Sequence, residues 1–99
     1  MSQVRWTPVA ASDLDDILFF IAFVAGNAET AERIYFEIRD RIARQISDAL
    51  PGLHHPDAPD WLYLKYKRWL VFYTPAADGI EIMRVIDAVR DLPRRLKES

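Results

Sequence analysis

The sequence contains no cysteine among its 99 residues, and it contains two histidines. The absence of cysteine excludes disulfides, iron–sulfur clusters, zinc sites built on thiolates and cysteine nucleophiles. A chain without disulfides suits a reducing compartment, so we expect a cytoplasmic protein.

Long hydrophobic runs are also missing. The longest one, residues 17–25, falls short of the roughly 18 to 20 apolar residues that a membrane-spanning helix needs. The N-terminus does not show the basic start, apolar stretch and small-residue cleavage site of a secretory leader. We therefore expect no membrane span, no membrane partner and no export.

A large excess of either charge is missing as well, since the formal net charge is −2. The charge is nevertheless uneven: residues 1–60 carry 5 basic and 10 acidic side chains, and residues 61–99 carry 8 basic and 5 acidic ones. The C-terminal part is where an anionic partner would be attracted. An ordinary solvated surface explains the same small excess equally well.

Apolar residues make up 51% of the sequence, which is enough for one hydrophobic core in a chain of this length. We expect a single domain over residues 1–99. Residues 3–6 alternate between polar and apolar types and predict a short strand. Thr7 and Pro8 then predict a helix start, because threonine caps helices and proline favours their first turn.

The predicted first helix is apolar on most of its surface. Phe19, Phe20 and Phe23 widen its apolar stripe, so we expect more than one neighbour to cover it. Its first turns hold three aspartates, which we expect to complement the helix dipole: Asp13, Asp15 and Asp16.

Gly26 and Asn27 predict a tight connection to a second, antiparallel helix, because glycine suits a left-handed helix end and asparagine caps the next helix. The apolar face of that second helix consists of Ala31, Ile34, Tyr35, Ile38, Ile42 and Ile46. The rest of it is charged and is expected to face solvent.

Residues 51–59 contain glycine and several prolines and predict a loop. Beyond them the hydrophobic period changes to two, and aromatic and β-branched residues predict three strands, over residues 61–66, 68–74 and 80–86. The turns between them are predicted near Lys67 and at residues 75–79, and residues 87–92 have room for a helical turn. The predicted fold is α+β, with the order β-α-α-β-β-β and a helix hairpin packed on an antiparallel sheet.

Two segments resemble a known family. Residues 7–17 read TPVAASDLDDI and are similar to the start of ParE-like toxins. Residues 69–73, 79–86 and 88–93 are similar to the paired terminal strands of that family and to its arginine–aspartate exit. In order and spacing the chain resembles the RelE/ParE superfamily of toxins from toxin–antitoxin pairs, and within it the ParE-like branch.

The resemblance implies a toxin that a cognate antitoxin silences, with a ParD-like ribbon–helix–helix protein as the expected antitoxin and DNA gyrase as the expected target. It implies no cofactor and no direct sequence-specific DNA binding. The RelE branch of the same fold cleaves messenger RNA on the ribosome, and this activity is the alternative. The chain departs from the family pattern at Asp87, where histidine is frequent, and at His54 and His55, where a glycine–arginine pair is frequent.

An RNase needs cations for the phosphate and a proton acceptor. Arg68, Arg84 and Arg90 are predicted to meet at one end of the sheet, with Lys65 and Lys67 close in sequence. The sequence offers no suitable base, because both histidines fall in the predicted loop and an aspartate between arginines is a weak proton acceptor. We therefore predict no catalytic residue and expect the chain not to be an enzyme.

The two adjacent histidines do not predict a metal site, since neighbouring side chains of an extended segment point to opposite sides. Arg84 interrupts an apolar strand, and a buried arginine needs an acidic partner. We expect that partner to be Asp87 or Glu81, with an antitoxin carboxylate as the other choice.

The cationic and C-terminal residues form the predicted partner- or target-binding surface: Lys65, Lys67, Arg68, Arg84, Arg90, Leu92, Arg94 and Arg95. The tail that holds the last four is equally compatible with a frayed terminus. The large aromatic residues are predicted to form an antitoxin groove: Phe19, Phe20, Phe23, Trp61 and Tyr63. For the two in the strands, plain cross-strand packing is the simpler interpretation.

Overall fold

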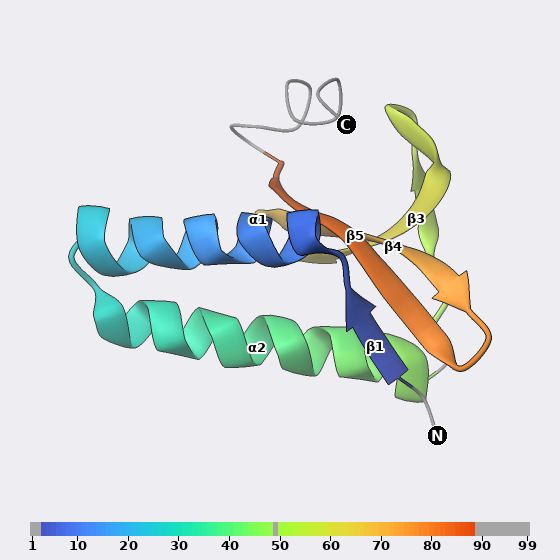
Figure 1. Cartoon of the computed structure of the whole chain (residues 1–99), viewed down its shortest axis with the longest axis horizontal. Helices are drawn as coiled ribbons and strands as arrows, with labels where there is room; N and C mark the ends of the chain where they lie inside the picture. Colours follow the sequence, from blue (N-terminus) through green and yellow to red (C-terminus); the bar gives the residue numbers. More distant parts are fainter. Residues whose placement is uncertain (1–2, 49, 89–99) are drawn as a thin grey trace.

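The computed structural model describes residues 3–48 and 50–88. Its elements are β1 (Gln3–Trp6), α1 (Pro8–Phe19), the π-helical segment η1 (Phe20–Val24), α2 (Ala28–Ser47), β2 (Leu53–His55), β3 (Ala58–Tyr66), β4 (Trp69–Ala76) and β5 (Gly79–Asp87). The two long helices form an antiparallel hairpin that covers one face of a twisted sheet (Figure 1). Within the described ranges, no helix combines the length and hydrophobicity that a bilayer span demands.

The sheet has five strands in the order β1-β5-β4-β3-β2. Strands β2 to β5 form an antiparallel meander, and β1 lies parallel to β5. The three predicted late strands and the helix hairpin are confirmed. The sheet is mixed, however, because the N-terminal strand β1 lies at its edge and runs parallel to β5.

The prediction of a loop over residues 51–59 is wrong, since β2 and the start of β3 lie within this segment. Its prolines are compatible with strands because they avoid the positions that need ladder hydrogen bonds. Pro56 lies in the turn between β2 and β3, and Pro59 precedes Leu62, the first β3 residue that pairs with β4.

The predicted caps and turns are present. The side chain of Thr7 accepts a hydrogen bond from the first turn of α1, and the side chain of Asn27 does the same for α2. Gly26 has a φ of 72°, the left-handed conformation expected at the helix end, and Lys67 has a φ of 52° in the turn between β3 and β4. Local sequence rules therefore account for every connection from β1 to α2.

The first helix differs from the prediction at its C-terminal end, where η1 continues α1 with a wider π-helical turn. The Ala25 N–H donates to the Phe20 carbonyl oxygen, five residues earlier, at 2.9 Å. None of the five residues of η1 is buried, and Phe23 keeps 74% of its surface exposed. Within the described part of the chain, this end of the apolar helix is therefore largely uncovered.

The core consists of two layers, one on each face of the sheet. The larger layer lies between the sheet and the hairpin and includes Ile38, Ile42, Val71 and Ile82, each 1% exposed or less. The smaller layer lies on the other face, around Phe72. Ala31, Ile34, Ile38 and Ile42 of α2 are buried as predicted, while Tyr35 and Ile46 are half-buried.

Candidate partner-binding site

The start of α1 completes the edge of β5. Strand β1 pairs with β5 over residues 79–82 and no further. Beyond that point the Thr7 N–H donates to the Ile82 carbonyl oxygen at 3.1 Å, and the Val85 N–H donates to Asp13 Oδ2 at 3.1 Å. Thr7 and Asp13 thus provide hydrogen-bond partners for the backbone of β5 beyond the point where β1 ends.

Arg84 and Asp13 form a buried ion pair between β5 and α1. Arg84 Nε donates to Asp13 Oδ2 at 2.8 Å, and Arg84 Nη2 donates to Asp13 Oδ1 at 3.2 Å. Each residue is 7% exposed, and the two-pronged geometry is the strong form of an arginine–carboxylate contact. The expectation of an acidic partner within the chain is confirmed, and Asp13 is a partner that the sequence did not predict; Asp87 and Glu81 stay predictions.

A second ion pair fixes the end of β5. Arg68 Nη2 lies 2.7 Å from Asp87 Oδ2, and the Ala88 N–H donates to the Arg68 carbonyl oxygen at 2.8 Å. The Asp87 side chain is nearly buried, whereas Arg68 is half-exposed. Arg68 therefore contacts the end of β5 twice, with its side chain at Asp87 and with its backbone carbonyl group at Ala88.

A pocket of about 470 Å³ opens beside these ion pairs, between the hairpin and the turn that joins β3 to β4. We call it the charged pocket. Its floor is apolar, with Ile34 and Trp69 among its residues. Its walls carry both charges: Asp13, Asp16, Asp87, Arg33, Lys67 and Arg68.

A shallow groove, also of about 470 Å³, runs along the outer side of the hairpin. We call it the hairpin groove, and its lining consists of Asp15, Leu18, Phe19, Ala22, Phe23, Ala31, Glu32, Tyr35 and Phe36. Phe19, Phe23 and Phe36 are 59%, 74% and 60% exposed. So large an exposed aromatic surface on a small domain is typical of a protein-binding site.

The structure holds acidic and basic groups in pairs and leaves aromatic rings exposed, which suits a binding protein. The family model described as the ParE toxin of the type II toxin–antitoxin system parDE matches residues 4–92. The chain belongs to the ParE toxin family. It is therefore a toxin of a type II toxin–antitoxin system, and an antitoxin is its implied partner.

A solved structure described as the chromosomal ParDE toxin–antitoxin system from P. aeruginosa is similar to this ParE-family toxin in fold. The match has a TM-score of 0.67 and 19% sequence identity, and it covers 88% of this chain and 96% of the other. At this identity the likeness concerns the fold alone. No curated protein is significantly similar to the chain in sequence.

The cations predicted to bind a partner or target have different surroundings in this ParE-family toxin. Arg68 and Arg84 bind separate carboxylates, and Lys67 Nζ lies 3.7 Å from Glu37 Oε2. Lys65 is exposed on β3. The remaining residues of that surface lie outside the described ranges: Arg90, Leu92, Arg94 and Arg95.

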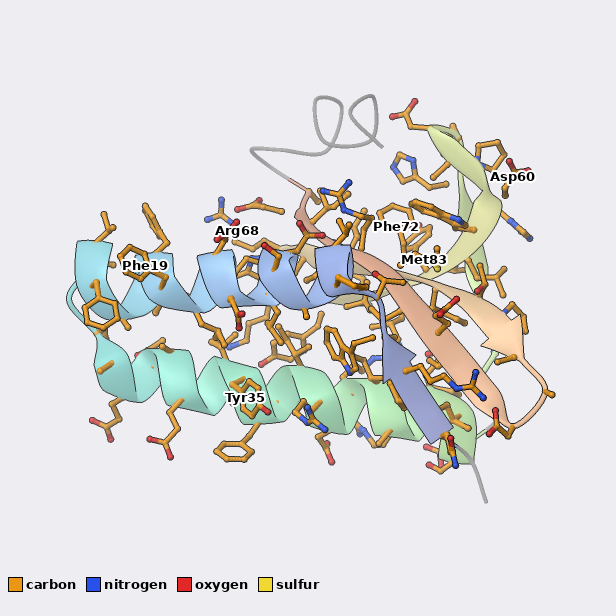
Figure 2. The ribbon with its side chains drawn as sticks, viewed as in Figure 1. Phe19, Tyr35, Asp60, Arg68, Phe72 and Met83 are labelled. Carbon is orange, nitrogen blue, oxygen red and sulfur yellow. The ribbon has the colours of Figure 1, made fainter. Side chains whose placement is uncertain are left out.

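The five aromatic residues of the predicted antitoxin groove do not form one surface. Phe19 and Phe23 lie on the hairpin groove, whereas Phe20 lines the charged pocket. Trp61 and Tyr63 pack on the opposite face of the sheet, with ring centroids 5.9 and 5.8 Å from that of Phe72. Figure 2 shows Phe19 near the outer end of the hairpin, remote from Phe72.

Sequence reasoning assigned Asp13 to the helix dipole and missed its contact with Arg84. Helix α1 begins at Pro8, so Asp13 lies beyond the first turn, where the dipole has little effect. It also missed Gln45, which is buried and donates to the Tyr73 hydroxyl at 3.0 Å. The position of Gln45, three residues after Ile42 on the apolar face of α2, was the available indication.

The two histidines lie at the edge of the sheet, in β2. His55 Nδ1 accepts a hydrogen bond from the Asp57 N–H at 3.0 Å, and His54 Nδ1 lies 3.3 Å from the Pro59 carbonyl oxygen. Within residues 3–48 and 50–88, no three acidic or histidine side chains gather as metal ligands would. These contacts order the β2–β3 turn.

Proposed function

We propose that this ParE-family toxin acts by binding DNA gyrase and that a cognate antitoxin, a ParD-like ribbon–helix–helix protein, neutralises it. Membership of the parDE toxin family supports the ParD-like antitoxin, and the resemblance to ParE-like toxins supports the choice of gyrase. The proposed binding mode rests on two ion pairs. Arg68 and Arg84 each lie less than 3 Å from a carboxylate oxygen of this chain. For these two arginines to bind a phosphate, each would have to give up its ion pair, which supports a function that does not depend on phosphate binding.

RelE-like cleavage of messenger RNA is the alternative. It requires cations at the phosphate and a proton acceptor at the 2′-hydroxyl group. Recruiting Arg84 to a phosphate would separate it from Asp13 in a site where both are 7% exposed, and breaking a buried pair is strongly unfavourable. That cost favours protein binding over cleavage.

The exposed rings of the hairpin groove support the antitoxin part of the proposal. Phe19 and Phe23 lie 4.9 Å apart between ring centroids, and Phe36 lines the same groove. Antitoxin segments that are disordered alone fold on surfaces of this kind. We propose that the antitoxin's C-terminal segment covers the hairpin groove and that the C-terminal tail of the toxin contacts gyrase.

Two assays in parallel test the target. Purified toxin is added to a gyrase supercoiling reaction and to a ribosome-programmed cleavage reaction. Inhibited supercoiling with intact message is expected, and cleaved message with unaffected supercoiling would refute the proposal.

The tail variant R94A/R95A is expected to lose gyrase inhibition and to keep antitoxin binding. The matched control is R44A, which removes an exposed arginine that pairs with Asp40 on the surface of α2. Its inhibition is expected to equal that of the unmodified toxin. Loss of inhibition in both variants would point to general charge and not to the tail.

A further inference from the structure

The floor of the charged pocket is built from residues of the main core. Ile34 and Trp69 contribute to it, and they are 3% and 8% exposed. Val85 and Ile86 of β5 belong to the same lining and are also buried. The volume of about 470 Å³ lies within the range of small-molecule sites, roughly 300–1,000 Å³.

The cations on one wall of this pocket share a single carboxylate. Arg33 Nε lies 3.7 Å from Glu37 Oε1, and Lys67 Nζ lies 3.7 Å from Glu37 Oε2. Both distances exceed the length of a close charge-assisted hydrogen bond, about 2.7–2.9 Å. Two positive charges and one negative charge leave a net charge of +1 on this wall. The wall therefore has room for one more anionic group.

The backbone of Lys67 adopts an unusual conformation at this wall. Its φ of 52° lies in the left-handed region, which glycine adopts with less strain than lysine does. Left-handed residues other than glycine concentrate at functional sites. The turn between β3 and β4 therefore keeps a lysine at the pocket where glycine would suit the backbone better.

Asp16 gives the opposite wall a negative charge. It lies on α1, one turn after Asp13, and is exposed. Among residues 3–48 and 50–88, Asp16 takes part in no ion pair, whereas Asp13 and Asp87 each pair with an arginine. A ligand with a second negative charge at its far end would be repelled by Asp16. The pocket thus suits one anionic group and not two.

The shape and the charges together select a class of ligand. The pocket is bounded by α1, η1, α2, the β3–β4 turn and the end of β5, so its occupant is a small molecule and not a folded surface. A hydrated inorganic anion would leave the apolar floor in contact with water. An uncharged apolar molecule would cover the floor but give Arg33 and Lys67 no new acceptor.

We infer that the charged pocket binds a small organic monocarboxylate with an aromatic or branched aliphatic body. The body covers Ile34 and Trp69, and the carboxylate accepts hydrogen bonds from Arg33 and Lys67. This site is separate from the hairpin groove, since no residue lines both. The inference goes beyond the proposed function and does not depend on the identity of the toxin's target.

The test uses the isotope-labelled, full-length chain and three probes of nearly equal shape: para-ethylbenzoate, para-ethylbenzamide and para-ethylbenzylamine. Binding is followed in two-dimensional NMR spectra through the indole N–H of Trp69 and the backbone N–H of Ile34. The benzoate is expected to bind with a Kd on the order of 1 mM, as its small size allows. It is expected to bind about fivefold more tightly than the benzamide, and added salt is expected to reduce this difference.

Variants of the two walls separate charge from apolar contact. R33Q/K67Q is expected to bind the benzoate and the benzamide equally, because both substituted side chains are more than half exposed and their loss leaves the floor intact. The matched control is K65Q, which removes an exposed lysine of β3 that does not line the pocket, and it is expected to keep the fivefold preference. D16N is expected to bind terephthalate, which carries a second carboxylate, more tightly than the unmodified chain does.

K67G distinguishes loss of the site from loss of the fold. It is expected to be at least as stable as the unmodified chain in urea unfolding, because glycine suits the left-handed turn, and to lose most of the preference for the benzoate. Equal binding of the benzoate and the benzamide by the unmodified chain, or tighter binding of the benzylamine, overturns the inference. A preference that survives in R33Q/K67Q overturns it too, as does the absence of binding by every probe at ten times the expected Kd.

Discussion

Replacing Asp13 with alanine tests the contact that joins α1 to β5. The substitution removes two hydrogen bonds to the Arg84 guanidinium, at 2.8 and 3.2 Å, and one to the Val85 N–H at 3.1 Å. Removing one member of a buried ion pair costs about 3–5 kcal/mol. Leaving the buried Val85 N–H without its acceptor costs about 1–3 kcal/mol. The two costs are not added, because both arise at the same site.

We therefore expect D13A to lower the free energy of unfolding by about 3–5 kcal/mol. Urea unfolding followed by circular dichroism measures this change. If the slope of the unfolding free energy against urea concentration stays the same, the substitution has not changed the denatured state. The matched control is D15N, which neutralises an exposed carboxylate on the same helix and is expected to change stability by less than about 0.5 kcal/mol.

A double-mutant cycle with R84A identifies the cause. If the ion pair carries the effect, R84A in the D13A background adds little to the loss, because the interaction is already gone. The apolar pair D13L/R84M is expected to recover part of the stability, as apolar replacements of buried ion pairs do, while the Val85 N–H stays without its Asp13 acceptor. A D13A protein within about 1 kcal/mol of the unmodified chain would refute the importance of this pair.

Other positions give smaller, independent tests. G79A is expected to cost about 1–3 kcal/mol in urea unfolding, because a Cβ there would overlap the backbone of Gln3 and push β1 off the sheet. Q45A is expected to cost about 1–3 kcal/mol in the same assay, because it removes the bond to the Tyr73 hydroxyl. F23S is expected to leave stability within about 0.5 kcal/mol and to reduce self-association in sedimentation velocity, since this ring is 74% exposed. A strong loss of stability in F23S would mean that the ring supports the fold.

The parts of the fold that follow from local chemistry could be predicted from the sequence. The Thr7 and Asn27 caps, the left-handed Gly26 and the turn at Lys67 each depend on residues within four positions of one another. The period-two pattern beyond residue 60 likewise reports which side chains alternate between two faces. None of these features needs knowledge of a distant partner.

The parts that failed depend on contacts between distant positions or on context. Arg84 and Asp13 are 71 positions apart, so a search for partners among nearby acidic residues did not reach Asp13, and it did not reveal that Asp87 pairs with Arg68. Hydrophobic periodicity does not distinguish a π-helical turn from an α-helical one, so the π-helical form of η1 was not foreseen. The predicted antitoxin groove stays a prediction, but its residues were chosen by type, which does not reveal that Trp61 and Phe19 lie on different faces of the molecule.

The pairing of the cations leads to a last prediction, about salt. A protein that binds nucleic acid through 6–10 phosphate contacts loses about a thousandfold to a hundred-thousandfold in affinity between 50 and 200 mM salt. In this toxin Lys67, Arg68 and Arg84 each lie within 4 Å of a carboxylate. Because they are already paired, they add less to the salt dependence of binding than unpaired cations on a phosphate backbone would. We expect the affinity for gyrase, measured by surface plasmon resonance, to fall by about tenfold or less over that range. A fall of a thousandfold would refute this reasoning, because it would show that binding to gyrase depends on many charged contacts of the toxin.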